Sequence, residues 1–353
     1  MPDVPTKIPL PRQVAIVSYR LGGTDGVSIE AAKWGRAFGE LGAGVTTIAG
    51  GGVADAIVSG LAADSADPVD TRRLAEGLRH ADLVVVENCC SLPLNPRVGE
   101  ALTVALAGRP AVLRHHDLAW QRPQYRHEAP PPDDEAWWHV TINERSRLEL
   151  AARGIEAVTF YNCFDPDLRG GDREGTRTDL GVTAGEVLAL QPTRAIPRKN
   201  VAGGVLFARA LGAAYWLLGP AEDGYGPELE AILDKADVRV LRGMPAGRSI
   251  ADAYAACDVV VLPSVFEGFG NPSVESALHR RPLAIGRYPV ASELRRFGFS
   301  WFDAGDPVAA AAATSRFLAA PDPRMLDHNE RVAKERFSTG DLSERLRRLV
   351  TSG

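Results

Sequence analysis

The chain alternates short apolar runs with segments of helical periodicity along most of its length. The run Val14 to Ser18 is typical of a buried parallel strand, and residues 27–41 repeat apolar positions at helical spacing before Gly42. Further short apolar runs predict strands at residues 45–48, 83–86, 111–114, 139–142 and 157–160. This alternation indicates a parallel sheet with crossover helices.

The pattern breaks between Phe164 and Val182, where a stretch rich in Asp, Gly, Arg and Thr is typical of a linker. A second series then predicts helices from about Pro323 onwards and strands at residues 187–190, 214–218, 238–241, 258–262 and 283–285. A chain of 353 residues also exceeds what one ordinary core supports. We therefore predict an α/β protein with a first doubly wound domain at 1–165, a linker at 166–182, a second doubly wound domain at 183–325 and C-terminal helices at 326–353.

Composition narrows the classes of function. A hydrophobic content of 45% and a charged content of 24% are those of a soluble globular protein, and a net charge of −5 argues against nucleic acid as a partner. The four cysteines lack paired metal-ligand spacing, so we expect reduced thiols and neither a disulfide framework nor a zinc site. Residues 1–12 lack the apolar region of a signal peptide, and no later run reaches membrane-spanning length. We expect a cytoplasmic enzyme.

Two acids flank a glycine loop in the stretch Ser264 to Leu278. Glu267 precedes the loop and Glu275 follows it, and ionised carboxylates accept hydrogen bonds from sugar and ribose hydroxyls but do not hold phosphate. The alternative is that Glu275 only offsets a helix dipole while Glu267 is a solvated loop charge. Their pairing directly after a predicted strand favours a site for a sugar donor.

The glycine loop itself suits an anion. Asn271 is a good N-cap and Pro272 suits the first helical position, so a helix is predicted to begin here. Backbone amides then gather at the helix N-terminus, where they favour a diphosphate. The donor-binding candidates in the loop are Gly268, Phe269 and Gly270.

Cations follow the first strand of the second series. Arg194 and Lys199 bracket a strand-to-helix turn whose helix is predicted to be capped by Asn200. A planar guanidinium and a compact ammonium together suit neutralisation of a diphosphate without a metal. The alternative is a solvated loop with two ordinary cations, and Arg198 between them has an equal claim to a position facing solvent.

The first predicted strand leads into residues 21–28, a glycine-rich loop. Its glycines allow close approach of the backbone to a ligand, with Gly23 as a donor-binding candidate and Asp25 as an acceptor candidate; simple turn chemistry is the alternative. The loop is not Gly-x-Gly-x-x-Gly, so an NAD-dependent enzyme loses its main support. Serine hydrolases and phosphate-loop NTPases are also disfavoured, because neither a Gly-x-Ser-x-Gly elbow nor a Walker loop occurs.

Two further candidates follow strands of the first domain. His116 lies just past the predicted strand 111–114, where an imidazole can orient a donor sugar or carry charge near the reacting carbon. A structural histidine is the alternative, and metal binding by His115 with His116 is disfavoured because successive residues of an extended segment point opposite ways. Asn88 follows the strand 83–86 and is an acceptor candidate.

The segment after His116 mixes aromatic rings with guanidiniums and is predicted to be a long loop. Aromatic faces stack on sugars and arginines bind carboxylate or phosphate, so this loop is the candidate acceptor site. The alternative is that its tryptophans, Trp137 and Trp138 among them, pack over a core edge. The loop's acceptor candidates are Trp120, Arg122 and Arg126.

Taken together, these residues resemble the retaining glycosyltransferases of family 4, which have the GT-B fold. The resemblance rests on the two acids, the cation pair, the glycine loop after the first strand, the strand-end histidine and two further segments. These segments are residues 161–165, Tyr-Asn-Cys-Phe-Asp, and residues 218–220, Leu-Gly-Pro. The resemblance implies two Rossmann-like domains facing a cleft, with a C-terminal helix that crosses back onto the first domain.

The same resemblance implies roles for individual residues. Glu267 would contact the donor hexose and Glu275 the ribose, Arg194 and Lys199 would hold the diphosphate, and backbone near Met244 would meet the nucleobase. Glu267, Arg194, Lys199 and His116 would form the catalytic set, with the leaving phosphate itself taking the acceptor proton.

We therefore predict a metal-independent hexosyltransferase that uses a nucleoside diphosphate sugar as co-substrate and needs no other cofactor. Its acceptor would be a small molecule or glycan, and an anionic acceptor is one of the candidates. The alternatives are a GT-B relative that binds nucleotide sugars or glycans without catalysis, and a sugar phosphorylase.

Overall fold

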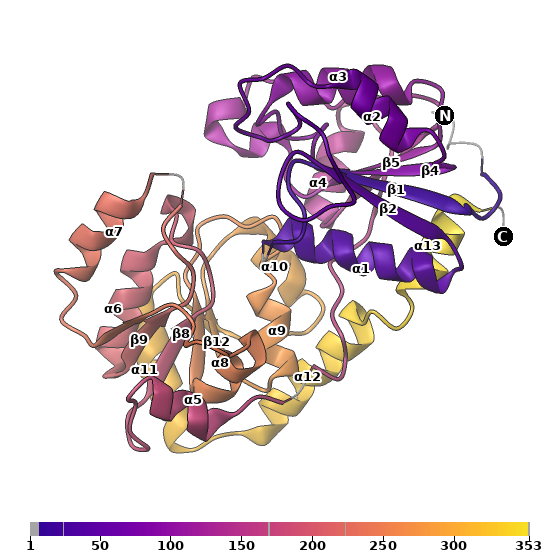
Figure 1. Ribbon diagram of the computed structural model, residues 1–353. Helices are drawn as coiled ribbons and strands as arrows, with labels where there is room; N and C mark the ends of the chain where they lie inside the picture. Colours follow the sequence, from indigo (N-terminus) through magenta and orange to yellow (C-terminus); the bar gives the residue numbers. More distant parts are fainter. Residues whose placement is uncertain (1–6, 24, 169, 223, 352–353) are drawn as a thin grey trace. The chain divides into compact units, whose positions relative to one another are not determined.

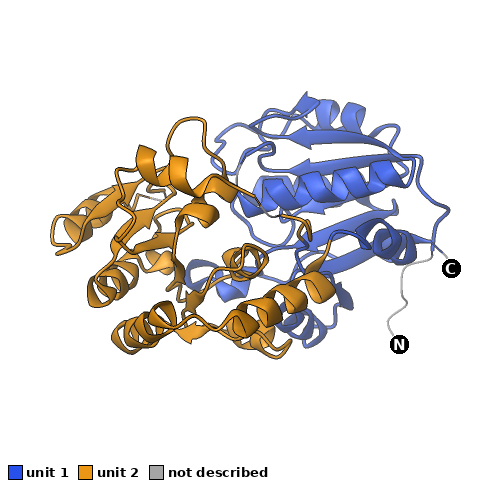
Figure 2. Cartoon of the chain, turned by 90° about the horizontal axis from the view of Figure 1, so that it is seen from below, with its two compact units in different colours: residues 1–163, 339–353 blue, residues 164–338 orange. Residues whose placement is uncertain are grey.

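The computed structural model describes residues 7–23, 25–168, 170–222 and 224–351 (Figure 1). The chain divides into two compact units (Figure 2). Unit 1 comprises Met1–Cys163 together with Thr339–Gly353, and unit 2 comprises Phe164–Ser338. Unit 1 is thus built from both ends of the chain, whereas unit 2 is one uninterrupted stretch.

Unit 1 contains a seven-stranded parallel sheet in the order β3-β2-β1-β4-β5-β6-β7. The strand order reverses between β1 and β4, which makes their carboxyl ends the switch point where doubly wound sheets bind ligands. The strands are β1 Gln13–Ser18, β2 Gly44–Ala49, β3 Ala56–Ile57, β4 Leu83–Glu87, β5 Ala111–His115, β6 Trp137–Thr141 and β7 Ala157–Thr159. The helices are α1 Gly26–Glu40, α2 Thr71–Leu78, α3 Pro96–Leu106, α4 Glu144–Ala151 and α13 Leu342–Val350, with short 3₁₀ turns η1 Ala119–Gln121 and η2 Pro123–Tyr125.

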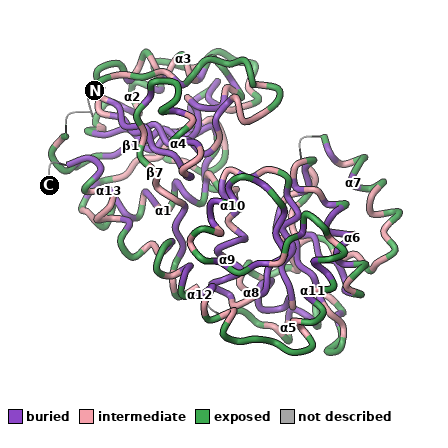
Figure 3. The backbone as a smooth tube through the Cα atoms, turned by 180° about the vertical axis from the view of Figure 1, so that it is seen from behind, coloured by how far each residue is buried: buried purple, intermediate pink, exposed green. Residues whose placement is uncertain are grey.

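Each face of the unit 1 sheet carries its own core. Successive side chains of a strand point to opposite faces, so Ile16 joins a cluster with Trp34 of α1 and Leu346 of α13. Its neighbour Val17 joins the other cluster, with Leu102 of α3. Because helices cover both faces, the central strands β4, β5 and β6 are buried at every residue, whereas β3 and β7 at the sheet edges are partly exposed (Figure 3).

Unit 2 contains a six-stranded parallel sheet in the order β10-β9-β8-β11-β12-β13, with the switch point between β8 and β11. The strands are β8 Leu188–Gln191, β9 Ala214–Leu217, β10 Val240–Arg242, β11 Val259–Leu262, β12 Leu283–Ile285 and β13 Phe302–Asp303. The helices are α5 Arg173–Asp179, α6 Val201–Leu211, α7 Gly226–Leu233, α8 Ile250–Ala256, α9 Pro272–Leu278, α10 Pro289–Arg295, α11 Pro307–Ala319 and α12 Pro323–Phe337, with the 3₁₀ turn η3 Pro197–Lys199. On one face, Phe207 of α6 and Ala311 of α11 pack on Val259 and Val261 of β11.

The predicted strands are all present, with ends displaced by at most a few residues. β3 and β13 were not predicted, because two residues each are too short to show a pattern. The stretch 166–182, which was predicted to be a linker, lies within unit 2 and contains α5. Arg173 of α5 donates hydrogen bonds to the carbonyls of Ala255, Ala256 and Cys257. These polar contacts fix α5 to the rest of unit 2, and a search for apolar periodicity cannot detect them.

The C-terminal helices also differ from the prediction. Only residues 339–353 belong to unit 1, where α13 contacts α1, whereas α12 belongs to unit 2 and contacts α9. The N-terminal boundary lies at Cys163, close to the predicted 165. The chain segments at the two boundaries are joined within unit 2 by a hydrogen bond from the Phe164 amide to the Phe337 carbonyl, 2.6 Å long.

Candidate active site

The loops that leave β8 and β11 are fastened together at the switch point of unit 2. Asn200 caps α6 by accepting a hydrogen bond from the Gly203 amide at 3.1 Å, as predicted. Its Nδ2 also donates to the Pro263 carbonyl in the loop after β11, at 3.2 Å. The Val265 amide in turn donates to the Arg198 carbonyl at 2.9 Å. These backbone and cap contacts hold the two loops in one arrangement.

The centre of this arrangement is the buried carboxylate of Glu267. Its Oε1 accepts hydrogen bonds from Lys199 Nζ at 2.5 Å and from Ser264 Oγ at 2.6 Å. Its Oε2 accepts a hydrogen bond from Arg198 Nη1 at 2.7 Å. The structure thus brings together Glu267 and Lys199, which the sequence placed in one site.

The role of Arg198 was left open by the prediction, in which the residue could equally face solvent. Its guanidinium instead bridges the Glu267 carboxylate and the Phe266 carbonyl, at 2.7 and 3.0 Å. The tight η3 turn lets the adjacent side chains of Arg198 and Lys199 reach the same carboxylate. Nothing in the linear spacing revealed this.

Neighbouring positive charges keep the Glu267 carboxyl ionised. Burial alone would raise the pKa of this carboxyl, but Lys199 and then Arg198 outweigh burial and hold the pKa at about 2. Burial lowers the pKa of Lys199 and outweighs the opposing attraction of Glu267. With two basic side chains against one ionised carboxylate, the cluster is suited to receive an anion.

We expect the Glu267 cluster to stabilise the fold in a pH-dependent manner. The folded pKa of about 2 lies below the ordinary value of 4.5, so the stabilisation is complete above pH 4.5 and is lost as the pH falls towards 2. Glu267→Gln should therefore lower the free energy of unfolding most at neutral pH, and the deficit should shrink between about pH 4.5 and 2. Urea denaturation at a series of pH values measures this difference, and a deficit independent of pH would contradict the assignment.

Arg194 lies near this cluster but has a different partner. Its Nη1 pairs with Glu222 at 2.5 Å, and both side chains are about one-third exposed. The positive charge of Arg194 makes a small contribution to the lowered pKa of Lys199, so the two charges lie close enough to interact. Glu222, in the loop after β9, was not among the predicted site residues.

The glycine loop has a defined shape for steric reasons. Gly270 has φ of +91°, and an added Cβ would lie 2.5 Å from Tyr288 Oη, so only glycine fits. The Phe269 side chain is buried and stacks on Phe164 with ring centroids 6.1 Å apart, so it positions the loop through packing.

The start of α9 differs from the prediction. Pro272 occupies the first helical position as predicted, but the Asn271 side chain makes no capping hydrogen bond and its backbone is already helical. α9 has only seven residues, so its dipole is small and the basic side chains carry more of any anion's charge.

Glu275 and Met244 occupy separate positions in unit 2. Glu275 lies on α9, and its Oε2 accepts a hydrogen bond from the Tyr254 hydroxyl at 2.7 Å. Met244 follows β10, where the Gly243 carbonyl accepts a hydrogen bond from Trp216 Nε1 at 2.8 Å. This contact fixes the turn that the resemblance assigns to the nucleobase.

In unit 1, His116 lies at the carboxyl end of β5 and belongs to a buried network of charges. Its Nε2 lies 2.5 Å from Glu87 Oε2, and Glu87 Oε1 pairs with Arg114 at 3.2 Å. Arg114 also binds Glu30 of α1 at 2.8 Å, and Glu30 pairs with Lys33 at 2.6 Å. Burial alone would raise the pKa of Glu87, but Arg114 and His116 hold it below its ordinary value. The network fixes one ring nitrogen of His116 against a carboxylate.

The candidates Asp25 and Asn88 of unit 1 make hydrogen bonds that hold the local backbone. Asp25 caps α1 by accepting hydrogen bonds from the Ser28 amide at 3.1 Å and from the Ser28 hydroxyl at 2.8 Å. Gly23 lies beside Asp25, and a Cβ added at Gly23 would lie 2.9 Å from Asp25 Oδ2. Thr24 lies outside the described residues.

Asn88 is buried, and its Oδ1 accepts hydrogen bonds from the amides of His116 and Asp117 at 3.0 and 3.1 Å. Asn88 thus holds the segment that carries His116.

The predicted acceptor loop contains the two short 3₁₀ turns η1 and η2, and two of its aromatic residues were placed wrongly. Trp137 and Trp138 lie in β6, with one side chain in each core of unit 1. Trp120 donates from Nε1 to Glu149 at 2.7 Å and stacks under Arg153, whose guanidinium carbon lies 3.8 Å from the ring centroid.

The two arginines of this loop also have partners. Arg122 pairs with Asp117 at 2.7 Å, which neutralises the charge that was predicted to bind an anionic acceptor. Arg126 Nε donates to His127 at 2.9 Å on an exposed part of the loop.

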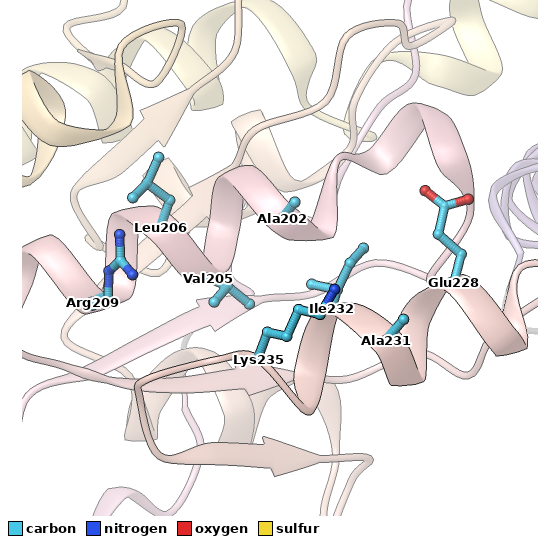
Figure 4. Close-up of a pocket in the computed structure, with 8 residues that line it drawn as sticks. All are labelled: Ala202, Val205, Leu206, Arg209, Glu228, Ala231, Ile232 and Lys235. Carbon is cyan, nitrogen blue, oxygen red and sulfur yellow. The ribbon is translucent and has the colours of Figure 1, made fainter.

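A groove of about 350 Å³ lies elsewhere in unit 2, between α6 and α7 (Figure 4). Its lining includes Val205 and Ile232, with Arg209 and Lys235 at one end and Glu228 at the other. None of the predicted donor residues lines it.

Within the part of the chain that the structure describes, no group of three or more His, Cys, Asp or Glu side chains is arranged to hold a metal ion. The helices of that part all fall short of the length and apolarity needed to cross a membrane.

Comparison with known proteins identifies similar sequences and structures. Residues 205–320 match a family model described as Glycosyl transferases group 1. Mannosylglucosylglycerate synthase from Thermotoga maritima is 24% identical over an alignment of 429 positions, which covers 96% of this chain and 99% of that protein. The synthase of the same name from Petrotoga mobilis is 23% identical over 79% of this chain and 83% of that protein.

Solved structures share the fold over almost the whole chain. Anabaena Alr3699/HepE in complex with UDP-glucose superposes with a TM-score of 0.76 at 17% identity, over 95% of this chain and 98% of that one. Sucrose-phosphate synthase from Thermosynechococcus elongatus superposes with a TM-score of 0.73 at 14% identity, over 96% and 98%. The chain is a glycosyltransferase with the GT-B fold.

The predicted fold class and the predicted resemblance to GT-B glycosyltransferases are thus confirmed. Membership of family 4 in particular, retention of configuration and the role of each residue of this glycosyltransferase stay predictions.

Proposed function

We propose that this glycosyltransferase transfers a hexosyl unit from a nucleoside diphosphate sugar to a small hydroxylated acceptor, with retention of the anomeric configuration. The proposal is carried by the buried Glu267 carboxylate, held by Lys199 and Arg198 at the switch point of unit 2. An ionised carboxylate beside surplus positive charge matches a ligand that offers hydroxyls next to a diphosphate.

Each group would have a distinct task. Glu267 would accept hydrogen bonds from hydroxyls of the hexose, and Lys199 with Arg194 would stabilise the charge that develops on the departing diphosphate. Glu275 would bind the ribose. His116, held by Glu87, would orient the transferred sugar. We propose same-face attack in which the leaving phosphate takes the acceptor proton, without a metal or any cofactor besides the donor.

The acceptor is proposed to be a small sugar or sugar acid. The relatives from Thermotoga maritima and Petrotoga mobilis are named for a product that contains two sugars and glycerate, a small carboxylate. Since Arg122 is paired with Asp117, Arg126 is the better of the two predicted arginines for contacting an anionic acceptor. We further propose that the enzyme acts in the cytoplasm and has no nucleic-acid partner.

Incubation of the protein with a panel of UDP-, GDP- and ADP-sugars tests the proposal. Slow release of a nucleoside diphosphate from one donor, accelerated by a small sugar or sugar acid, is the expected result, and the anomeric configuration of the product can be read by NMR. Binding of a nucleotide sugar without turnover towards any acceptor would instead indicate a non-catalytic relative. A product of inverted configuration would contradict the mechanism.

A further inference from the structure

Tyr254 of α8 connects two helices next to the nucleotide site proposed above. Its side chain is fully buried, and its hydroxyl donates to Oε2 of Glu275 on α9 at 2.7 Å. Glu275 itself is only partly buried. One oxygen of this partly buried acid is therefore held by a buried hydroxyl.

The Tyr254 ring is itself held in place. It stacks on the ring of His279, which follows α9, with centroids 4.7 Å apart and ring planes within 2° of parallel. Burial and then Arg281 lower the pKa of His279 to about 4, so the imidazole is neutral at pH 7. Burial and then Glu275 raise the pKa of Tyr254, so its hydroxyl keeps the proton that it donates.

We propose that Tyr254 is a positioning residue, which fixes the Glu275 carboxylate in the orientation that binds the ribose of the nucleotide. The inference rests on the proposed function and deepens it. A glutamate with a free side chain loses rotamer freedom when it binds a ligand, whereas an acid already held by a buried hydroxyl has lost that freedom on folding. Tyr254 makes its contribution without contacting the nucleotide.

Tyr254→Phe tests this inference, because it removes one hydroxyl and keeps the stacked ring. Calorimetry would compare the nucleoside diphosphate that the donor panel selects, UDP for example, with its 2′-deoxy counterpart. We expect the variant to lose about tenfold in affinity for the ribonucleotide, the size of one charge-assisted hydrogen bond, and little for the deoxynucleotide. Glu275→Gln should show the same selective loss, and the double variant should lose little more than either single variant.

Tyr19→Phe is the matched control. It also removes the hydroxyl of a buried tyrosine, but one that donates to the carbonyls of Cys89 and Leu92 in unit 1. Both nucleotide affinities should be unchanged. If Tyr254→Phe does not fold, His279→Ala, which frees one side of the Tyr254 ring, should show a smaller loss with the same preference for the ribonucleotide.

The outcomes separate this inference from the function on which it rests. Equal losses for the ribo- and deoxynucleotide would mean a merely structural role, and an unchanged ribonucleotide affinity in Tyr254→Phe would also overturn the inference. Either result would leave the proposed function intact. A wild-type protein that binds none of the nucleoside diphosphates would refute the proposed function and this inference with it.

Discussion

Lys199→Ala is expected to lower kcat/KM for the sugar nucleotide by on the order of 100-fold and to weaken the binding of free nucleoside diphosphate. The ammonium lies in a buried site, where a charge that stabilises the departing diphosphate acts with little screening by water. After its removal, Arg198 and Ser264 still donate hydrogen bonds to Glu267, but the ammonium contact is lost. Donor hydrolysis rates and calorimetry with the free nucleotide measure the two effects.

Lys235→Ala provides the control for this experiment. Lys235 belongs to the same unit but lines the groove between α6 and α7, so its removal should change neither quantity (Figure 4). If Lys199→Ala binds the free nucleotide as tightly as the wild type, Lys199 does not hold the diphosphate.

Substitution of Glu275 and substitution of Glu267 are expected to affect different ligands. Glu275→Gln should weaken free nucleoside diphosphate by about tenfold, because a ribose contact is present in both the free nucleotide and the donor. Glu267→Gln should spare the free nucleotide and lower turnover of the intact sugar nucleotide by on the order of 100-fold, because the hexose is absent from the free nucleotide. Calorimetry with the nucleotide and kinetics with the donor provide the comparison.

A similar loss of free-nucleotide affinity in both variants would refute this division of labour. Because Glu267→Gln leaves Lys199 buried beside a neutral amide, its folding must be checked by thermal unfolding before the kinetics are compared. Glu267→Asp, which keeps the charge on a shorter side chain, should retain more of the stability than of the turnover.

The sheets could be predicted because parallel strands covered on both faces have almost continuous apolar sequences. The stretch from Val259 to Leu262 is one example, and the structure buries all of it. α5 could not be predicted in the same way, since Arg173 and Arg177 attach it to unit 2 through carbonyls and through Asp258. Helices fixed by such polar contacts leave no apolar period in the sequence.

The candidate site shows the same limit. Glu267 and Lys199 could be assigned to one site because both follow strand ends at a switch point, and the structure joins them. That Glu275 and Arg194 act in the same site stays a prediction. Their individual partners could not be predicted, because the contacts cross long sequence separations. Tyr254 with Glu275, and Arg194 with Glu222, are pairs that only folding brings together.

The two-part construction of unit 1 determines the order in which the chain can fold as it leaves the ribosome. Unit 2 is one continuous stretch, so its core can close before residues 339–353 are synthesised. Unit 1 must wait, because Leu346 and Val350 of α13 complete its core and the Ile8 amide pairs with the Val350 carbonyl at 2.9 Å. The N-terminal unit is thus the second to finish, and a nascent chain stalled before residue 339 would present the uncovered side of α1 to chaperones.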